Sequence, residues 1–271
     1  MLLDLHSHTS FSHDGRQTPE ENVKDALSCG IKILAFTDHA DLWYWDHQGT
    51  PFRTEGSVRA AEQLASLYND RIRVLRGIEL GESNQFPKRA AAILTNNRFD
   101  VVLASLHCLA AEGWNIAFSH IDFSEQACSV HRCENFFRAY LHSLADMAAV
   151  SDYDILAHLS VPLRYINGKY KRGLDLLSFR KEIETVLDIV VKRGKTLEVN
   201  CAGDEPCPEL PVLAWYKAMG GELVSIGSDA HAPGGTNRLN RLLIGQQSLK
   251  AAGFSRQCYY IDRKLHLCEL N

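Results

Sequence analysis

Two short motifs in this sequence pair a histidine with a second potential metal ligand two positions away. His6 and His8 follow the first short apolar run of the chain, and Asp229 and His231 follow the seventh. Side chains two positions apart on a β-strand point to the same side, so each pair can offer two donor atoms to one ion. Imidazole nitrogens and carboxylate oxygens suit borderline divalent metals such as zinc, manganese or iron. Both motifs therefore predict metal binding.

Further histidines and acids follow the apolar runs in between. A single histidine at such a position could simply mark where the chain meets water, but six of the twelve histidines fall in this group. Glu79 and Asp229 end otherwise apolar segments, where an unpaired carboxylate is costly. Nine nitrogen and oxygen donors are too many for one tetrahedral ion and predict two or three divalent ions. The candidate metal ligands are His6, His8, Asp14, His39, Glu79, His107, His158, Asp229 and His231.

Short apolar runs alternate along the chain with longer segments of helical periodicity, which predicts β-strands that alternate with α-helices. The first helix is expected to start at the capping sequence Thr18-Pro19-Glu20-Glu21 and to end before Gly30. Seven buried strands are expected at residues 2–5, 33–36, 72–75, 101–104, 155–157, 196–199 and 223–226. The other helices are expected at residues 57–68, 87–95, 130–149, 174–192 and 210–219.

Repeated βα units imply a parallel sheet that is closed or nearly closed, as in a TIM-like barrel. The ends of all the strands then lie on one face, where the candidate ligands would meet to form an active site. Residues 40–56 and 109–129 are long, aromatic and polar, and they are expected to form loops over this site. Because no linker or repeat interrupts the pattern, we expect a single α/β domain over residues 1–271.

Bulk composition limits the partners and the compartment. A net charge of −4 and a pI near 6.3 provide no general attraction to nucleic acid or anionic lipid, so neither a nucleic acid nor a membrane is expected as a partner. The first residues lack the basic segment and the long apolar stretch of a signal peptide, which favours the cytoplasm. The eight cysteines form no CxxC pair and are expected to be reduced. The oligomeric state is not indicated.

Seven stretches, in chain order, resemble the PHP (polymerase and histidinol phosphatase) family, specifically its histidinol-phosphatase-like branch. The resemblance covers essentially the whole chain, and the combination of motifs is specific. The matching stretches are HSHTSFSHDG from His6, FTDHAD from Phe36, RGIELGE from Arg76, SLH from Ser105, ILAHLS from Ile155, LEVNCAG from Leu197 and IGSDAHAP from Ile226.

The family resemblance implies a distorted (β/α)7 barrel, the PHP fold, with a trinuclear metal centre. Matched by position, His6, His8, Glu79 and Asp229 would hold one ion; Glu79, His107 and His158 would hold a second; and Asp14, His39 and His231 would hold the third. An aspartate at position 14, rather than a histidine, is usual in the histidinol-phosphatase branch.

The resemblance also implies a hydrolase of histidine biosynthesis that converts L-histidinol phosphate and water to L-histidinol and phosphate. A hydroxide that bridges two ions would be the nucleophile, and Arg164 would neutralise charge on the phosphoryl group. Asp14, His39, Glu79 and His231 would contribute to catalysis through the metals. The general acid for the leaving group is left open between His231 and a water. His13 and Arg16, in an expected site-facing loop, are further candidates for substrate binding, alongside Arg164.

The chain departs from this branch after the sixth strand. The branch usually has an Asn-Thr-Ser-Gly-Leu-Arg type of stretch there, whose arginine helps to bind the substrate phosphate. This chain has Asn-Cys-Ala-Gly-Asp-Glu at residues 200–205, without a basic residue. The alternative substrate is therefore another small phosphorylated metabolite.

Three further hypotheses compete with the phosphatase. A nuclease or phosphodiesterase could use the same metals, but the acidic pI and the lack of a basic stripe argue against it. A metal-binding regulatory module would not need so complete a ligand set. An amidohydrolase barrel would need a bridging lysine where this chain has Glu79. Asp38, beside His39, is expected either to orient an imidazole or to cap a loop.

Overall fold

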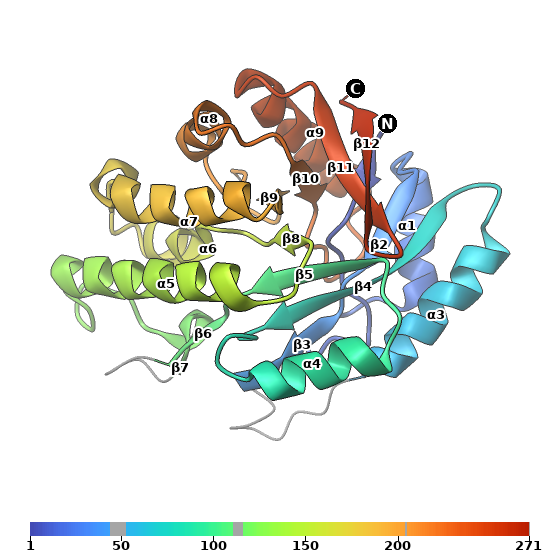
Figure 1. Ribbon diagram of the computed structural model, residues 1–271, viewed down its shortest axis with the longest axis horizontal. Coiled ribbons are helices and arrows are strands. Elements are labelled where there is room, and N and C mark those ends of the chain that lie inside the picture. Colours follow the sequence, from blue (N-terminus) through green and yellow to red (C-terminus); the bar gives the residue numbers. More distant parts are fainter. Residues whose placement is uncertain (44–52, 111–115, 204, 271) are drawn as a thin grey trace.

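The computed structural model describes residues 1–43, 53–110, 116–203 and 205–270 (Figure 1). Its centre is an eight-stranded sheet, in which seven parallel strands follow one another as β1-β2-β4-β5-β8-β9-β10 and β3 (His39–Asp41) pairs with β4. The seven strands are β1 (Leu3–Asp4), β2 (Ile33–Phe36), β4 (Arg73–Gly81), β5 (Val101–Ser105), β8 (Ile155–Leu156), β9 (Thr196–Asn200) and β10 (Val224–Gly227). Each overlaps a strand that the apolar runs predicted.

The two end strands of this path meet and nearly close a barrel. Leu5 donates a backbone hydrogen bond to the carbonyl of Ile226 at 3.0 Å, and Asp229 donates one to the carbonyl of His6 at 2.7 Å. The predicted α/β barrel of seven strands is therefore confirmed. That the whole chain is a single domain stays a prediction.

Helices surround the strands in Figure 1, with α3, α4, α5 and α7 in front and to the sides. The capping sequence at Thr18 forms as predicted, because its hydroxyl accepts from Glu21 N at 3.2 Å and its own N–H donates to the Glu21 carboxylate at 2.7 Å. The long helices are α1 (Pro19–Ser28), α3 (Thr54–Leu67), α4 (Pro87–Asn96), α5 (Val130–Val150), α7 (Arg180–Lys192), α8 (Leu210–Ala218) and α9 (Gly235–Ala251).

Several elements differ from the sequence prediction. The helix expected at 174–192 is split into a 3-10 turn, η3 (Leu176–Phe179), and α7. The expected loop segments contain β3 (His39–Asp41) and the small hairpin of β6 (Cys108–Leu109) and β7 (Ile116–Ala117), followed by η1 (Phe118–His120). Helix α9, the short helix α6 (Val161–Leu163) and the π-helix η2 (Arg164–Lys169) were not predicted.

A C-terminal hairpin of β11 (Arg256–Ile261) and β12 (Lys264–Glu269) was also not predicted. Its Cys258 and Tyr260 pack in one buried cluster with Leu3 and Leu5 of the barrel. Figure 1 shows the hairpin beside the N-terminus, and the terminal amine of Met1 donates to the Glu269 carbonyl at 3.3 Å.

A buried arginine connects the last long helix to the first strand. Arg238 of α9 is 2% exposed, and its guanidinium donates to Asp4 at 2.9 Å, to Asn22 at 2.9 Å and to Asp25 at 3.0 Å. The other oxygen of Asp4 accepts from Ser228 N at 2.8 Å. Asp4 therefore holds the end of β1 next to the segment that follows β10.

All eight cysteines are free in the structure. Within the ranges that the structure describes, no helix is both long enough and apolar enough to cross a bilayer.

Candidate metal centre

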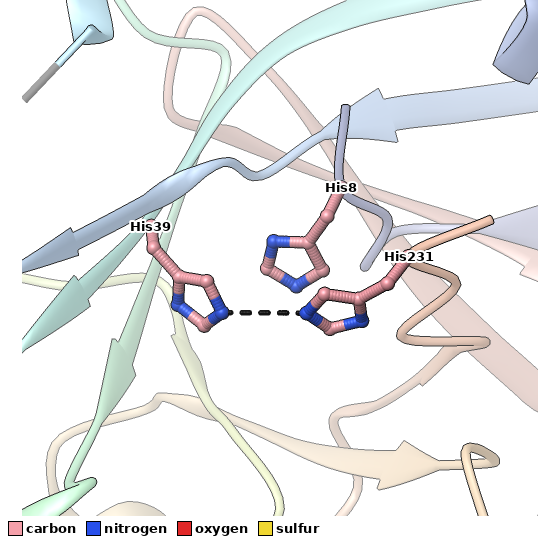
Figure 2. Close-up of side chains that lie close together, drawn as sticks. All are labelled: His8, His39 and His231. Carbon is pink, nitrogen blue, oxygen red and sulfur yellow. Dashed lines mark hydrogen bonds between the residues drawn. The ribbon is translucent and has the colours of Figure 1, made fainter. Parts of the chain in front are cut away.

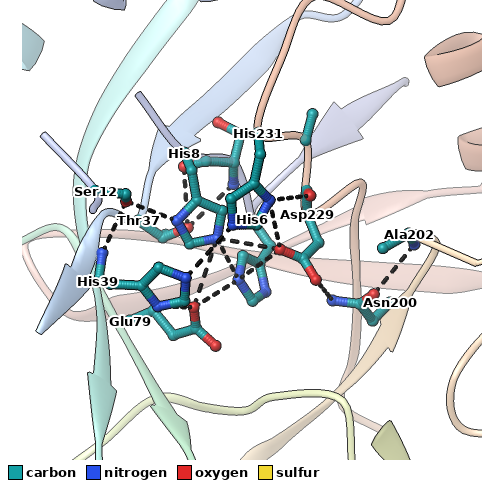
Figure 3. Close-up of polar contacts among 12 residues, drawn as sticks. His6, His8, Ser12, Thr37, His39, Glu79, Asn200, Ala202, Asp229 and His231 are labelled. Atoms are coloured by element: carbon teal, nitrogen blue, oxygen red, sulfur yellow. Dashed lines mark hydrogen bonds and ion pairs between the residues drawn. The ribbon is translucent and has the colours of Figure 1, made fainter. Parts of the chain in front are cut away.

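The first histidine pair and the last acid converge at the seam between β1 and β10. The Nε2 atoms of His6 and His8 are 3.1 Å apart, and Asp229 Oδ1 lies 3.7 Å and 3.1 Å from them. Glu79 Oε2 lies 3.2 Å from His6 Nε2 and 3.5 Å from His8 Nε2. The four predicted ligands of the first ion are therefore within reach of one point (Figure 3).

Glu79, at the end of β4, also contacts a second group of imidazoles. Its other oxygen, Oε1, lies 2.7 Å from His158 Nε2 and 3.2 Å from His107 Nε2. These two imidazole nitrogens are themselves 3.4 Å apart. One carboxylate thus turns each of its oxygens toward a different set of ring nitrogens, which is the arrangement expected of a bridging ligand.

The third predicted group lies at the mouth of the same site. Figure 2 shows His39 and His231 with their ring nitrogens facing one another at 3.4 Å, beside the ring of His8. Asp14 Oδ2 is 3.2 Å from His231 Nε2, and Asp14 Oδ1 is 3.7 Å from His39 Nε2. All nine candidate ligands therefore gather in one region, although they come from six separate strand ends and the loop after β1.

Several donor atoms of the site lack a hydrogen-bond partner in the described part of the chain or face another acceptor, which is the arrangement expected of ligands to divalent cations. Glu79 Oε2 is fully buried and accepts no hydrogen bond from any described residue, even though His39 Nδ1 lies 3.0 Å away. Buried polar atoms of native proteins nearly always have a partner. Three pairs of imidazole nitrogens also face one another at 3.1–3.4 Å. Lone pairs that converge in this way are stabilised by a shared cation.

Burial and neighbouring charges shift the pKa values of the candidate ligands in different directions. Burial alone would lower the pKa of His6, His39 and His107, but nearby carboxylates raise it well above its usual value. Burial, together with neighbouring His231 and His39, lowers the pKa of His8 to about 3, so this imidazole is neutral. Burial alone would raise the pKa of Glu79, but the surrounding imidazoles hold it well below its usual value. A neutral imidazole and an ionised carboxylate are the forms that bind metal.

Two more carboxylates contact the Nδ1 atoms of candidate ligands, on the side of the ring opposite the proposed metal. His6 Nδ1 pairs with Glu198 Oε1 at 2.6 Å, and His107 Nδ1 pairs with Asp41 Oδ1 at 2.9 Å. Both acids are at most 4% exposed. Such carboxylates fix the tautomer and the orientation of a metal-binding histidine. The sequence carried a signal for Glu198, because it is a lone acid inside the apolar strand Leu197–Val199.

Asp38 was expected above either to orient an imidazole or to cap a loop, and its contacts are of the second kind. Its carboxylate accepts from Thr9 N at 2.7 Å, from Ser12 Oγ at 2.8 Å and from Ser57 Oγ at 2.5 Å. It therefore ties the loop after β1 to α3, and none of these bonds involves a ring nitrogen. Ser12, in turn, faces His8 Nδ1 at 3.0 Å, so its hydroxyl links Asp38 to this imidazole.

Replacing Asp41 by asparagine is expected to lower kcat/KM by about 10- to 100-fold, with a matching loss of bound metal. Asparagine keeps the shape but removes the charge that holds the His107 ring, so that ring can turn. The measurement is turnover together with metal content. Asp188→Asn, an exposed acid paired with Lys192 on α7, is the matched control. Unchanged turnover in Asp41→Asn would show that this contact does not position His107.

A cavity of about 240 Å³ opens over the candidate metal ligands. Arg164, at the start of η2, lines it and donates to Asn200 Oδ1 at 2.7 Å. Phe118 and Tyr165, which sequence reasoning did not identify, provide aromatic walls. Of the other two predicted substrate contacts, His13 lines this cavity. Arg16 does not, and its backbone N–H donates to the His231 carbonyl at 2.7 Å.

The loop after β9 also borders this cavity. Ala202 is among the lining residues, and a Cβ atom added to Gly203 would lie 3.6 Å from Arg164 Nε. The loop therefore passes close to the arginine without adding a second basic side chain from its described residues.

Comparison with known proteins agrees with this architecture. Residues 4–202 match the PHP domain family. The chain is 26% identical to the histidinol-phosphatase of Lactococcus lactis over 84% of both sequences. It is 28% identical to a "Probable histidinol-phosphatase" of Clostridium acetobutylicum over 95% of this chain and 98% of that protein.

A solved structure shares the whole fold. The crystal structure of a histidinol phosphate phosphatase from Lactococcus lactis, complexed with zinc, L-histidinol and phosphate, aligns with a TM-score of 0.83. The alignment covers 98% of both chains at 22% identity. The matched domain, the barrel and the clustered metal-binding side chains lead to one conclusion. The chain belongs to the PHP domain family, within its histidinol-phosphatase-like branch of metal-dependent phosphatases.

Proposed function

We propose that this protein hydrolyses a small phosphomonoester at a centre of two or three divalent ions, either zinc, manganese or iron. The observation that supports it most strongly is the placement of Glu79, whose two oxygens face two separate groups of imidazoles. The proposed ligands are His6, His8, Glu79 and Asp229 for one ion, Glu79, His107 and His158 for the second, and Asp14, His39 and His231 for the third.

Ions held there would supply activation of water at neutral pH and Lewis-acid stabilisation of phosphoryl charge. The chain itself contributes positioning and charge. Arg164 reaches into the cavity from η2 and is held by Asn200, so its planar guanidinium is placed to make a bidentate contact with phosphate oxygens. Asp14 and His231 line the same cavity, and their side chains are more exposed than those of the other proposed ligands.

L-Histidinol phosphate is the first candidate substrate, and histidine biosynthesis the corresponding pathway. The names of the relatives favour it, and the protein would then release L-histidinol and phosphate. A second candidate is another small phosphorylated metabolite. The observation behind it is the loop after β9, where Ala202 and Gly203 lie beside Arg164 and no other described arginine or lysine lines the cavity. A cavity of about 240 Å³ is small for a nucleic acid, and we do not propose a nucleic acid as substrate.

The test is hydrolysis of L-histidinol phosphate by the purified protein, with bound metals counted by plasma emission on the same sample. His8→Ala is the control, and circular dichroism checks that it folds. Efficient turnover that disappears with metal in this variant supports the first candidate. Bound metal with feeble turnover, but good hydrolysis of other esters, favours the second. A protein that binds no metal and hydrolyses no phosphomonoester would overturn the proposal.

Replacing Arg164 by lysine is expected to lower kcat/KM for the preferred ester by about tenfold or more. Lysine keeps the charge but cannot make the bidentate contact, and a hydrogen bond to a charged group is worth about 1.5–3 kcal/mol. Steady-state kinetics on Arg164→Lys measures this, with metal content as a check. If the variant lost metal in proportion to activity, Arg164 would act instead by holding the proposed ligand Asp229 in place, 3.6 Å away.

A further inference from the structure

A second and larger cavity lies beside the metal centre. Its volume is about 630 Å³, within the range of small-molecule sites. It is lined by η2, the loop between β9 and α8, and α9, and it shares the lining residues Arg164 and Ala202 with the first cavity. The two cavities therefore adjoin, so a ligand bound in the first lies beside the second.

Three basic side chains line the second cavity. Arg164 is shared with the metal centre, while Lys171 and Arg241 belong to the second cavity alone. Among the described residues, no hydrogen bond or ion pair engages the side chain of Lys171 or that of Arg241. Both charges are therefore available to a ligand.

Helix α9 packs in a way that brings Arg241 to this place. Gly245, one turn later, lies so close to the β9 loop that an added Cβ atom would be 2.6 Å from Cys201 Sγ. Residues four apart share one helix face, so Arg241 lies beside this loop and lines the cavity together with Gly203. The positive charges near the loop therefore come from two elements, Arg164 of η2 and Arg241 of α9.

Two acids also line the second cavity, and one of them is already engaged. Ser160 donates its hydroxyl to Glu209 Oε2 at 2.7 Å, and burial raises the pKa of this carboxyl. Glu205 is exposed. Among the described lining residues there are three basic groups, one exposed acid and one acid of raised pKa, so the basic groups outnumber the acids. A neutral or cationic group would find less favourable electrostatics here than an anion.

We propose that the second cavity binds an additional acidic group, carboxylate or phosphate, of the substrate whose phosphate occupies the metal centre. Arg241 is the main contact, and Lys171 adds charge at the rim. This inference rests on the proposed phosphomonoesterase function and narrows it, because L-histidinol phosphate carries no second acidic group. It therefore favours the second candidate substrate class over the first.

Competition experiments test the inference, with 4-nitrophenyl phosphate as the reporter substrate of the metal-loaded protein. Glycerol 3-phosphate and 3-phosphoglycerate form one pair of competitors, which differ in a carboxylate. Fructose 6-phosphate and fructose 1,6-bisphosphate form the other, which differ in a phosphate. Inhibition constants are obtained whether or not a competitor is hydrolysed. The acidic member of at least one pair is expected to bind about tenfold more tightly, as a charge-assisted contact predicts.

Arg241→Gln links this preference to the cavity. The variant is expected to reduce the preference to about twofold or less, while hydrolysis of 4-nitrophenyl phosphate and inhibition by the acid-free competitors stay unchanged. Arg241→Lys should retain part of the preference. Lys250→Gln removes one positive charge from the last turn of the same helix and should change nothing.

The outcomes separate the two proposals. If 4-nitrophenyl phosphate is hydrolysed but neither acidic competitor binds better than its partner, the inference fails and the phosphatase stands. A preference that survives Arg241→Gln, or inhibition that is not competitive, also overturns the inference, since the acidic group would then bind elsewhere. Absence of any hydrolysis by the metal-loaded protein would remove both. A preference in the carboxylate pair or the phosphate pair alone supports the inference and identifies the acidic group.

Discussion

Replacing Glu79 by glutamine is expected to lower kcat/KM by about 10³-fold and to release at least one bound metal ion. Stabilisation by a bound metal amounts to several kcal/mol, and each 1.36 kcal/mol changes a rate by about tenfold. In the proposed centre this one carboxylate serves two ions, because each oxygen faces a different group of imidazoles. An amide has no charge and only one accepting atom, so it cannot serve both. Turnover and metal content, measured on the same sample, check the result.

Glu198→Gln is the matched control for this variant. Glu198 is as deeply buried as Glu79, but it contacts the opposite side of the His6 ring, at 2.6 Å from Nδ1. Its loss should cost only about 10- to 100-fold, as for other groups that orient a ligand. If the two variants lost activity equally while both kept their metal, Glu79 would be no bridging ligand.

Arg238→Met is expected to lower the free energy of unfolding by about 3–5 kcal/mol, because breaking a buried ion pair leaves a charge without a partner. Asp4 is completely buried, and Arg238 lies 2.8 Å from its carboxylate. For a chain of this size, the loss corresponds to a fall in Tm of roughly 6–20 °C. Chemical denaturation and thermal melting of the metal-free protein measure it directly.

Arg241→Met is the control for that prediction. Arg241 is on the same helix and one turn away, but it is partly exposed and has no ion pair among the described residues. Its replacement should change the free energy of unfolding by about 0.5 kcal/mol or less. Equal losses in the two variants would mean that helix propensity, rather than the pair with Asp4, accounts for the effect.

The apolar runs located all seven barrel strands because a buried parallel strand is a short, nearly continuous apolar segment. The candidate ligands could be recognised for the same reason, since a polar residue such as Glu79 or His158 interrupts or ends such a run. Their convergence, however, depends on barrel closure, which a local pattern does not contain. The repeated βα units and the family resemblance were needed to predict it.

Helix α9 was missed because its buried face does not look apolar. Arg238, Gln246 and Gly245 are all buried, together with Leu242 and Leu249. The apolar residues of this segment therefore show only a weak helical periodicity, although the helix is fully formed. The buried arginine is explained by its contacts with Asp4, Asn22 and Asp25, which are distant in the sequence.

The C-terminal hairpin could have been predicted in part. Residues 256–261 and 264–269 are rich in strand-forming side chains and are separated by two residues. The turn pair is Asp262-Arg263, with φ of 48° and 62°, and an arginine in the left-handed region is uncommon. Asp41 could also be predicted only in part. The motif that contains it was recognised in the sequence, but its contact with His107 depends on the pairing of β3 with β4.

The seam between β1 and β10 places the start and the end of the barrel path in contact at the proposed metal centre. Asp4 and Ser228, which are joined there by a hydrogen bond, are 224 positions apart. Contacts of such long sequence separation form late in folding, because the intervening chain must first be ordered. Ions held by His6, His8 and Asp229 would bind the closed barrel and not the open one, so they would stabilise closure by mass action. Metal binding would then occur only after the barrel has closed. A chain in which β10 has not yet paired with β1 would bind no metal there and would be inactive.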